Sequence, residues 1–460
     1  MREATKTGRC FKGLLFSVLI FVSGVSFAGA SPNIVLILID DLGWSDLACY
    51  GNKIVSTPHV DRLASQGMLF TDAYAAAPVC SPTRAALLTG KYPAALGLTD
   101  FIPGHLRPYA RLLPPHFKQA LPLEELTIAE ALKEAGYATA IFGKWHLGGR
   151  RFGPTRQGFD LYVGRGENRN DKQVTALTEA AVTFIDRNRS RPFFLFLSHY
   201  TVHIPLEAPH ALVDKYRRKL AAAPYPMHPA YAAMVEHMDW SVGQVLAALS
   251  RCGLTEKTLV IFTSDNGGLI RMYTGKGPAV TSNAPLRSEK GSLYEGGIRV
   301  PLIIKYPPLV PSGSKCSVPV SSIDIFPTCL QVAGAKLPKA VDGVSLVPLL
   351  GGRSALKRKA LYWHYPHYHH TSPCSAVRKE NFKLIEYFED GHLELYDLRK
   401  DLSEKNNLVR SLPQRAEALR AELQEWRREV GAALPRLNPA YDPARAGVWG
   451  KRTKKTQRKP

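Results

Sequence analysis

The sequence predicts an α/β fold whose core is a mostly parallel central β-sheet with helices on both faces. Two observations support it: short continuous apolar runs typical of strands buried on both faces, and helical patterns between those runs. Strands that alternate with helices favour parallel pairing through crossover connections. A small C-terminal α+β domain with an antiparallel sheet is predicted to follow.

The strands predicted for the central sheet are four apolar runs, at residues 33–39, 138–142, 193–197 and 258–263. The helical patterns between them cover residues 127–135, 173–188 and 231–250. Polar residues follow each run, and ligands of such sheets bind beyond the carboxyl ends of the strands. We therefore expect the chemistry of this protein at that edge of the sheet.

The sequence pattern changes after about residue 355. Short strands linked by turns are expected at residues 361–365, 375–378, 382–388 and 393–396, and a charged amphipathic helix at 413–430. The predicted organisation is a large domain at residues 31–355, a small C-terminal domain at 356–435 and a basic tail at 436–460. Because the tail is so rich in lysine and arginine, we expect it to be disordered.

The first thirty residues have the pattern of a secretory signal peptide. A basic start is followed by the apolar or small residues 13–27 and by Ala28-Gly29-Ala30, a small-residue cleavage pattern. An uncleaved membrane anchor is the alternative, because the apolar run is near the lower limit for a span. No later stretch is long and apolar enough to cross a bilayer, so we expect an exported protein without a stable membrane span after cleavage.

The formal net charge of the chain is +21. Such an excess suits a polyanionic substrate or surface. Nucleic acid is an alternative polyanion, but the sequence contains no nucleic-acid recognition motif, and export argues against it. We therefore expect no nucleic-acid partner.

Seven cysteines are present, of which Cys10 lies in the signal peptide. The remaining six form no dense disulfide framework. We expect most of them to be buried free thiols.

Two pairs of oxygen-bearing side chains follow the first and last predicted strands of the sheet. They are Asp40-Asp41 and Asp265-Asn266. Adjacent carboxylates repel each other, and a hard divalent cation relieves that repulsion by taking oxygen ligands. Zinc is disfavoured because no Cys/His ligand spacing accompanies the pairs. The alternative for either pair alone is a helix cap or a solvated turn.

The segment Cys80-Ser81-Pro82-Thr83-Arg84, followed by Leu88-Thr89-Gly90, resembles the signature of the sulfatase family. Alone, the cysteine could be a buried or ordinary reactive thiol at a helix start. The resemblance covers most of residues 33–435. The other matching segments are Asp40-Asp41, Gly143-Lys144-Trp145-His146-Leu147-Gly148, His203-Ile204-Pro205, Asp265-Asn266-Gly267-Gly268 and Lys290-Gly291 through Val300-Pro301.

The resemblance implies an alkaline-phosphatase-like fold and a bound divalent cation, usually Ca²⁺ rather than Mg²⁺. It also implies that a separate formylglycine-generating enzyme oxidises Cys80 to formylglycine, an aldehyde whose hydrate has two hydroxyl groups. One hydroxyl would bind the cation and attack sulfur. The implied metal ligands are then Asp40, Asp41, Asp265, Asn266 and the modified Cys80.

The resemblance gives the remaining site residues roles in the same reaction. Arg84 would hold the diol through its fixed fork of donors. Lys144 and Lys290 would neutralise charge on the sulfate oxygens. His203 would protonate the leaving alcohol, and His146 would deprotonate the second hydroxyl, although the two histidine roles could be exchanged.

The family also places a polar side chain after a Gly-Phe-Asp segment, here residues 158–160, where Asn168 is a candidate without a secure alignment. His364, His367, His369 and His370 lie close together in the sequence. A second metal site is one interpretation of this histidine cluster. A solvated loop that contacts sugar and influences substrate choice is the favoured one.

The leading functional prediction is the hydrolysis of sulfate esters, on an aryl sulfate or more naturally on a sulfated polysaccharide or its oligosaccharides. Export and positive charge favour the carbohydrate. One alternative is a phosphate or phosphonate monoester hydrolase of the same fold. The other is an exported polyanion-binding protein without catalysis, which predicts decay of site residues that the sequence does not display.

Overall fold

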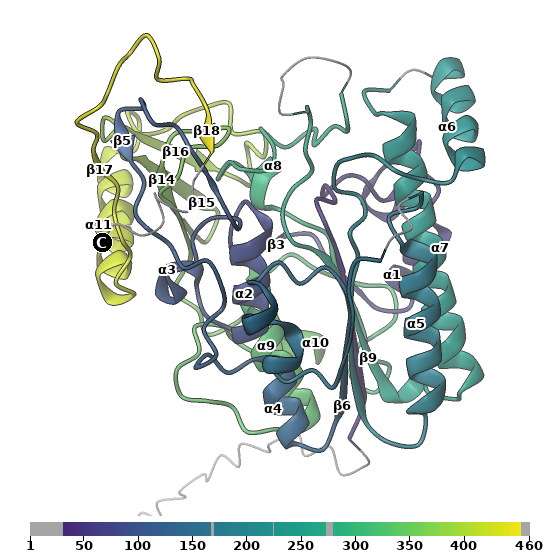
Figure 1. The fold of residues 1–460 in the computed structure, drawn as a ribbon. Coiled ribbons are helices and arrows are strands. Elements are labelled where there is room, and N and C mark those ends of the chain that lie inside the picture. The colour runs from purple at the N-terminus through teal and green to yellow at the C-terminus, as the bar shows by residue number, and fades with distance from the viewer. Residues whose placement is uncertain (1–30, 167–169, 224, 273–278, 452–460) are drawn as a thin grey trace, which may run out of the picture.

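The computed structural model describes residues 31–166, 170–223, 225–272 and 279–451. The predicted signal peptide, Asn168 and the end of the basic tail lie outside the described residues. In the described part, a central sheet lies between two layers of helices, and a smaller sheet with one long helix packs beside it (Figure 1).

The central sheet has eight strands in the order β11-β2-β10-β9-β1-β8-β6-β7. The pairings within this sheet are parallel except those of β10, which runs antiparallel to both neighbours. The predicted mostly parallel sheet is therefore confirmed. The strands are β1 (Asn33–Ile39), β2 (Met68–Phe70), β6 (Ala138–Gly143), β7 (Leu161–Val163), β8 (Phe193–Ser198), β9 (Thr258–Ser264), β10 (Leu302–Lys305) and β11 (Ser314–Cys316).

Strand β1 explains why the sheet needs helices on both faces. Its side chains alternate between two hydrophobic cores: Ile34, Leu36 and Leu38 contribute to one, and Val35, Ile37 and Ile39 to the other. All six are fully buried. A strand without a polar face is stable only between two apolar layers.

Helices cover both faces, as predicted. One layer contains α2 (Cys80–Thr89), α4 (Ile128–Glu134), α9 (Ile325–Ala333) and α10 (Val347–Leu350). The other contains α1 (Pro58–Ser65), α5 (Val174–Arg187), α6 (His210–Ala222) and α7 (Pro229–Arg251), which stand together at the right of Figure 1. The short helices α3 (Pro93–Leu96) and α8 (Glu295–Ile298) lie in the connections.

The C-terminal part forms a four-stranded antiparallel sheet in the order β13-β14-β15-β16, against which α11 packs. These elements are β13 (Leu361–Tyr365), β14 (Cys374–Lys379), β15 (Phe382–Tyr387), β16 (Leu393–Asp397) and α11 (Pro413–Glu429). This sheet shares its core with the larger part, because Trp363 packs with Tyr74 and donates a hydrogen bond to the Ala75 carbonyl.

Residues 436–451 differ from the expected disordered tail. Two short strands, β17 (Arg436–Leu437) and β18 (Gly450–Lys451), pair with β5 (Leu112–Leu113) and β4 (His105–Leu106). Asn438 fixes the segment by donating to the carbonyls of Pro108 and Ala110. Backbone pairing with a distant loop therefore holds residues 436–451, whereas the lysine- and arginine-rich end of the tail lies outside the described residues.

Two further findings bear on the sequence predictions. The cysteines of the described residues are free thiols, as expected, at positions 49, 80, 252, 316, 329 and 374. None of the helices in the described residues combines the length and the apolar character that a membrane crossing requires.

Candidate active site

The polar residues predicted to converge do so at the carboxyl ends of the central strands. Asp40 follows β1, Lys144 follows β6 and Asp265 follows β9, and these three strands belong to the same parallel set. Helix α2 brings Cys80 and Arg84 to this edge, and the loop before α8 brings Lys290.

Cys80 begins helix α2 and is almost fully buried, with 2% of its surface exposed. Its Sγ lies 3.2 Å from Nδ1 of His146. The opposite ring nitrogen of His146, Nε2, lies 2.5 Å from the carbonyl oxygen of Ile102 and must donate to it. A neutral His146 therefore turns the lone pair of Nδ1 towards position 80, as a base at that position requires.

The surroundings of Cys80 favour negative charge. Burial opposes ionisation of the thiol, but Lys144, His146 and Lys290 outweigh it and hold the pKa of Cys80 well below its usual range. Position 80 is therefore surrounded by groups that stabilise an anion.

Arg84 lies one helical turn after Cys80 and is 1% exposed. Its Nε and Nη2 lie 2.9 and 2.7 Å from Oδ2 of Asp265. Its Nη1 donates to Oγ of Ser198 at 2.6 Å and to the carbonyl of Lys144 at 3.1 Å. The guanidinium thus joins α2 to the ends of β6, β8 and β9.

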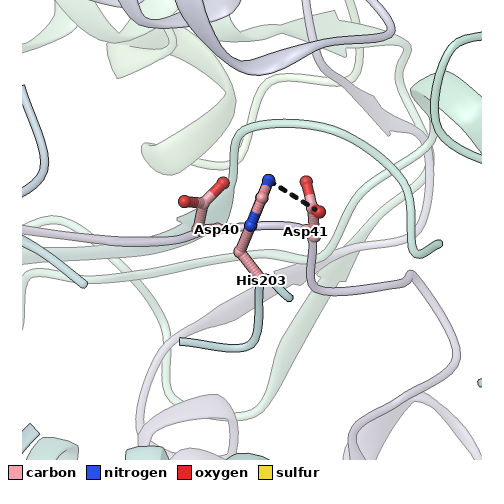
Figure 2. A group of neighbouring side chains, drawn as sticks. All are labelled: Asp40, Asp41 and His203. Atoms are coloured by element: carbon pink, nitrogen blue, oxygen red, sulfur yellow. Dashed lines mark ion pairs between the residues drawn. The ribbon is translucent and has the colours of Figure 1, made fainter. Parts of the chain in front are cut away.

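Each of the two adjacent carboxylates pairs with a lysine. Lys144 Nζ lies 2.5 Å from Oδ2 of Asp40, and Lys290 Nζ lies 2.8 Å from Asp41. Nε2 of His203 is 3.7 Å from Oδ2 of Asp41, and Figure 2 shows the imidazole between the two carboxylates. Despite burial, Lys144 and its neighbours hold the pKa of Asp40 below its usual range, so Asp40 is ionised.

The donor set fits a hard cation. Oδ1 of Asp40 and Oδ1 of Asn266 are buried and have no hydrogen-bond partner among the described residues. Asn266 donates its Nδ2 to Asp41 at 2.8 Å, which leaves its carbonyl oxygen as an available ligand. Burial and the nearby Asp40 raise the pKa of Asp265, a sign of crowded negative charge that a cation relieves.

The ligand set defined by proximity differs in part from the predicted one. Ligand atoms of Asp40, Asp41 and His203 lie within 4.8 Å of one another. Asp265 is less available than predicted, because Arg84 occupies its Oδ2 and the backbone N–H of Asp41 donates to its Oδ1 at 3.1 Å. Asp40 and Asp41 are among the predicted ligands, whereas His203 is predicted as a proton donor.

The backbone around the site is unusual. Asp41 and His146 have positive φ angles of 64° and 57°, in a region of backbone conformation that residues other than glycine rarely adopt. A Cβ at Gly143 would lie 1.8 Å from the Ser198 carbonyl oxygen, so only glycine allows β6 and β8 to approach so closely just before Lys144. These constraints position the side chains of the site.

The site opens into a pocket of about 520 Å³. Asp40, Lys144, His146 and His203 lie on its wall. The other polar residues that line the pocket are Arg150, Tyr162, Arg165, Lys172, Gln173 and Glu207. This volume lies in the range of pockets that bind small molecules and is larger than one sulfate group. The pocket therefore has room for part of a larger substrate.

Of the four histidines of the cluster, only His370 is exposed, as the predicted solvated loop requires. His364, His367 and His369 are buried, with 6%, 1% and 6% of their surfaces exposed. His364 bonds to Ser375 and the Ala433 carbonyl, which is a structural role. The cause is the C-terminal sheet, whose first strand β13 contains His364 and draws the following residues inward.

His369 and His370 instead support the segment that contains Lys290. His370 Nδ1 lies 2.5 Å from the Lys290 carbonyl. A Cβ at Gly291, where φ is 82°, would lie 2.0 Å from Nδ1 of His369. The tight packing at glycine fixes the backbone from which Lys290 reaches Asp41.

Sequence reasoning missed two kinds of residue. Ser198, which bonds both Arg84 and the Lys144 carbonyl, stands at the carboxyl end of β8 and could have been found by the strand-end rule. Lys172 and Gln173 precede α5 and face the pocket. Nothing in their local pattern distinguishes them from ordinary residues before a helix. The predicted candidate Asn168 lies outside the described residues.

Comparison with known proteins decides the family. The family model for sulfatases matches residues 32–335. The chain belongs to the sulfatase family. A second model, described as the C-terminal part of N-sulphoglucosamine sulphohydrolase, matches residues 288–429 of this sulfatase.

Similar proteins match nearly the whole sulfatase chain. A sulfatase of Formosa agariphila is 33% identical over 87% of this chain and 89% of its own length. Arylsulfatase A of Homo sapiens is 32% identical over 88% of this chain and 89% of its own length. The solved structure of Ps i-CgsB in complex with k-i-k-neocarrahexaose has a TM-score of 0.75 and 29% identity, covering 89% of this chain and 94% of that one.

These findings confirm an arylsulfatase-like sulfuric ester hydrolase with the expected fold. Hydrolysis of sulfate esters is thus favoured over the two alternatives, phosphate or phosphonate ester hydrolysis and polyanion binding without catalysis.

Proposed function

We propose that this sulfatase is an exported enzyme that carries formylglycine at position 80, binds one Ca²⁺ and removes sulfate from a sulfated carbohydrate. The observation that carries the proposal is the position of Cys80. It lies buried beside His146 and the two lysines, at the edge of a carboxylate cluster that has free oxygen atoms. The conversion of Cys80 requires a formylglycine-generating enzyme as a partner during maturation.

Asp40, Asp41, Asp265 and Asn266 would hold the Ca²⁺, with His203 next to them. When bound, the cation supplies positive charge for sulfate oxygens and lowers the pKa of a coordinated hydroxyl. Ca²⁺ is preferred over Mg²⁺, because an irregular cluster of carboxylate and amide oxygens suits a cation that tolerates variable geometry. Zinc is disfavoured, because this group of ligands contains no cysteine and consists mainly of oxygen atoms.

The hydrated aldehyde at position 80 offers two hydroxyl groups, one as a nucleophile for sulfur and one for the later release of sulfate. His146 presents the lone pair of Nδ1 to position 80, so it would take the proton of the second hydroxyl. Arg84 would fix the diol through a guanidinium already held by Asp265 and Ser198. A plain cysteine or serine has no second hydroxyl and no such route to turnover.

His203 would protonate the leaving alcohol. Its Nδ1 lies 2.6 Å from the Ile204 carbonyl and donates to it, so Nε2 is the nitrogen near Asp41, and the residue lines the pocket. A proton on Nε2 would therefore be directed at the substrate. Lys144 and Lys290 would neutralise the sulfate oxygens at the transition state.

A carbohydrate is the proposed natural substrate. The chain is strongly basic, and the similar protein Ps i-CgsB has been solved with k-i-k-neocarrahexaose, an oligosaccharide. A pocket of about 520 Å³ has room for more than the ester group. Small aryl sulfates would then act as surrogates that report the chemistry. Export is proposed from the signal-peptide pattern of residues 1–30.

The test compares aryl sulfate with aryl phosphate and phosphonate, using the full chain produced together with a formylglycine-generating enzyme. The proposal predicts faster turnover of the sulfate ester and loss of turnover in Cys80→Ala. Faster turnover of the phosphorus esters would favour the alternative hydrolase. Binding of sulfated glycans without any turnover would favour the polyanion-binding protein.

A further inference from the structure

The pocket extends beyond the catalytic residues into a group of polar side chains that the reaction does not use. This group, which we call the basic lobe, consists of Arg165, Lys172, Gln173 and Glu207. Lys172 and Gln173 are each 6% exposed, whereas Arg165 is exposed. Burial of a lysine and an amide next to a catalytic pocket requires an explanation, because such groups are usually solvated.

Gln173 has an unused donor. Its Nε2 is buried and has no hydrogen-bond partner among the described residues. Buried polar groups are nearly always satisfied in folded proteins, by protein atoms, water or a bound ligand. The amide of Gln173 is therefore available to a polar ligand atom in the basic lobe.

The backbone of the lobe is strained. Lys172 and Gln173 both have positive φ, 55° and 61°. Asp171 holds this turn, because its carboxylate accepts from the backbone N–H groups of Gln173 at 2.9 Å and Thr175 at 3.1 Å. Consecutive left-handed residues other than glycine cost free energy that a structural turn could avoid, so the turn is better explained by the need to present these two side chains to the pocket.

The charge of the lobe is positive and only partly balanced. Lys172 Nζ lies 3.8 Å from Oε2 of Glu207, longer than a hydrogen bond. Burial lowers the pKa of Lys172. The carboxylates of Glu207 and Asp40 oppose this shift, whereas the cations Arg165 and Lys144 add to it, so the cations of the lobe and of the catalytic centre repel one another. An anionic ligand group would relieve that repulsion.

We propose that the basic lobe is a subsite for a second anionic group of the carbohydrate, on the unit next to the sulfate ester that is cleaved. Lys172, Gln173 and Arg165 would bind the anion, either a second sulfate or a sugar carboxylate. Oε2 of Glu207, which has no hydrogen-bond partner among the described residues, would accept from a sugar hydroxyl. The inference rests on the proposed sulfatase activity and narrows its substrates to carbohydrates with at least two anionic groups.

Three disaccharides test the subsite: one with a single sulfate ester, one with a second sulfate, and one with a carboxylate in its place. The readout is the ratio of kcat/KM between each doubly anionic disaccharide and the monosulfated one. Lys172→Met and Arg165→Ala are expected to reduce this ratio about 10- to 100-fold, the loss of a charge-assisted hydrogen bond. The doubly anionic disaccharide whose kcat/KM ratio falls more in these variants identifies the second anion as a sulfate or a carboxylate.

Arg151→Ala is the matched control, because Arg151 is exposed beside Arg150 but does not line this pocket. Its ratio is expected to equal that of the unchanged enzyme. Arg165 is exposed, so its substitution tests the lobe even where Lys172→Met fails to fold. An unchanged ratio in Arg165→Ala and in folded Lys172→Met would overturn the proposal, as would an enzyme without preference for the second anion.

Calorimetric binding of the doubly anionic disaccharides to a Cys80→Ala chain separates the subsite from catalysis. Tight binding that Lys172→Met weakens about 10-fold or more would support the subsite. Binding that is equally tight in both chains would overturn it. Failure of the unchanged, modified enzyme to release sulfate from an aryl sulfate would instead contradict the proposed function, irrespective of the binding result.

Discussion

Arg84 and Asp265 form a buried ion pair in which two guanidinium nitrogens contact one carboxylate oxygen, at 2.9 and 2.7 Å. The pair joins the helix that begins with Cys80 to the end of strand β9. It links the predicted nucleophile to the predicted metal cluster through a single rigid contact. An arginine is required for this contact, because its fork of donors reaches Asp265, Ser198 and the Lys144 carbonyl together.

Replacement of Arg84 by lysine is expected to lower kcat by a factor of about 10²–10³, similar to the removal of a catalytic hydrogen-bond donor. A lysine has one nitrogen and cannot keep all the contacts of the guanidinium. Steady-state kinetics on an aryl sulfate measure the effect. Arg156→Lys, at an exposed position, is the control and should keep full activity. Equal activity of the two variants would show that Arg84 contributes only charge.

His203→Ala is expected to affect substrates according to their leaving groups. General acid catalysis contributes about 10²–10⁴-fold, and mainly where the departing alcohol is a poor leaving group. The variant should therefore lose far more activity on an alkyl or sugar sulfate than on an activated aryl sulfate. A comparison of kcat/KM across sulfate esters of graded leaving-group pKa measures this. Equal losses on all esters would assign the proton transfer to another residue.

Ca²⁺ is expected to raise the thermal stability of the full chain. A ligand present at about 100 times its Kd stabilises the folded state by about 2.7 kcal/mol, and a chelator should remove this gain. Asp40→Asn weakens the cluster, so its unfolding temperature should respond little to Ca²⁺. Calorimetry with and without chelator provides a readout that is independent of turnover. An unfolding temperature of the unchanged protein that does not change when Ca²⁺ is added or chelated would contradict the metal assignment.

His364 should make stability depend on pH. Burial lowers the pKa of His364 to about 4 from its usual value of about 6.5, so the folded state favours the neutral ring. The contribution of His364 to the free energy of unfolding is fully present above about pH 6.5. It is lost as the pH falls towards 4, and the total loss is roughly 3 kcal/mol. Urea unfolding at several pH values measures the slope.

His364→Gln keeps a polar side chain but does not titrate, so its stability should fall less between pH 6.5 and 4 than that of the unchanged protein. His392→Gln is the control, since His392 is an exposed histidine near the same small sheet. The control should keep the slope of the unchanged protein. A slope unaltered by His364→Gln would show that other groups cause the acid sensitivity.

The sequence predicted the catalytic edge of the sheet because local patterns determine it. Asp40 and Asp265 follow apolar runs that pair as neighbouring strands β1 and β9, so the strand-end rule alone brings them together. The motif around Cys80 and Arg84 added the nucleophile. Ser198 stands at the carboxyl end of β8, so the same rule would have predicted it if applied to every strand of the sheet.

Other features depend on contacts between distant segments, which local patterns do not encode. Strand β18 near the C-terminus pairs with β4, more than 300 residues earlier in the chain, so no local pattern predicts it. His367 and His369 are buried because the C-terminal sheet packs against the larger part of the fold. The turn at Lys172 and Gln173 became visible only through its φ angles and the pocket that it faces.

The central claim is that position 80 must be formylglycine for turnover, and mass spectrometry of the peptide that contains it tests this most directly. Preparations with different extents of modification are compared on an aryl sulfate. Specific activity is expected to rise in proportion to the fraction of the peptide that carries the lighter aldehyde residue. Full activity in a preparation whose residue 80 is entirely unmodified cysteine would contradict it.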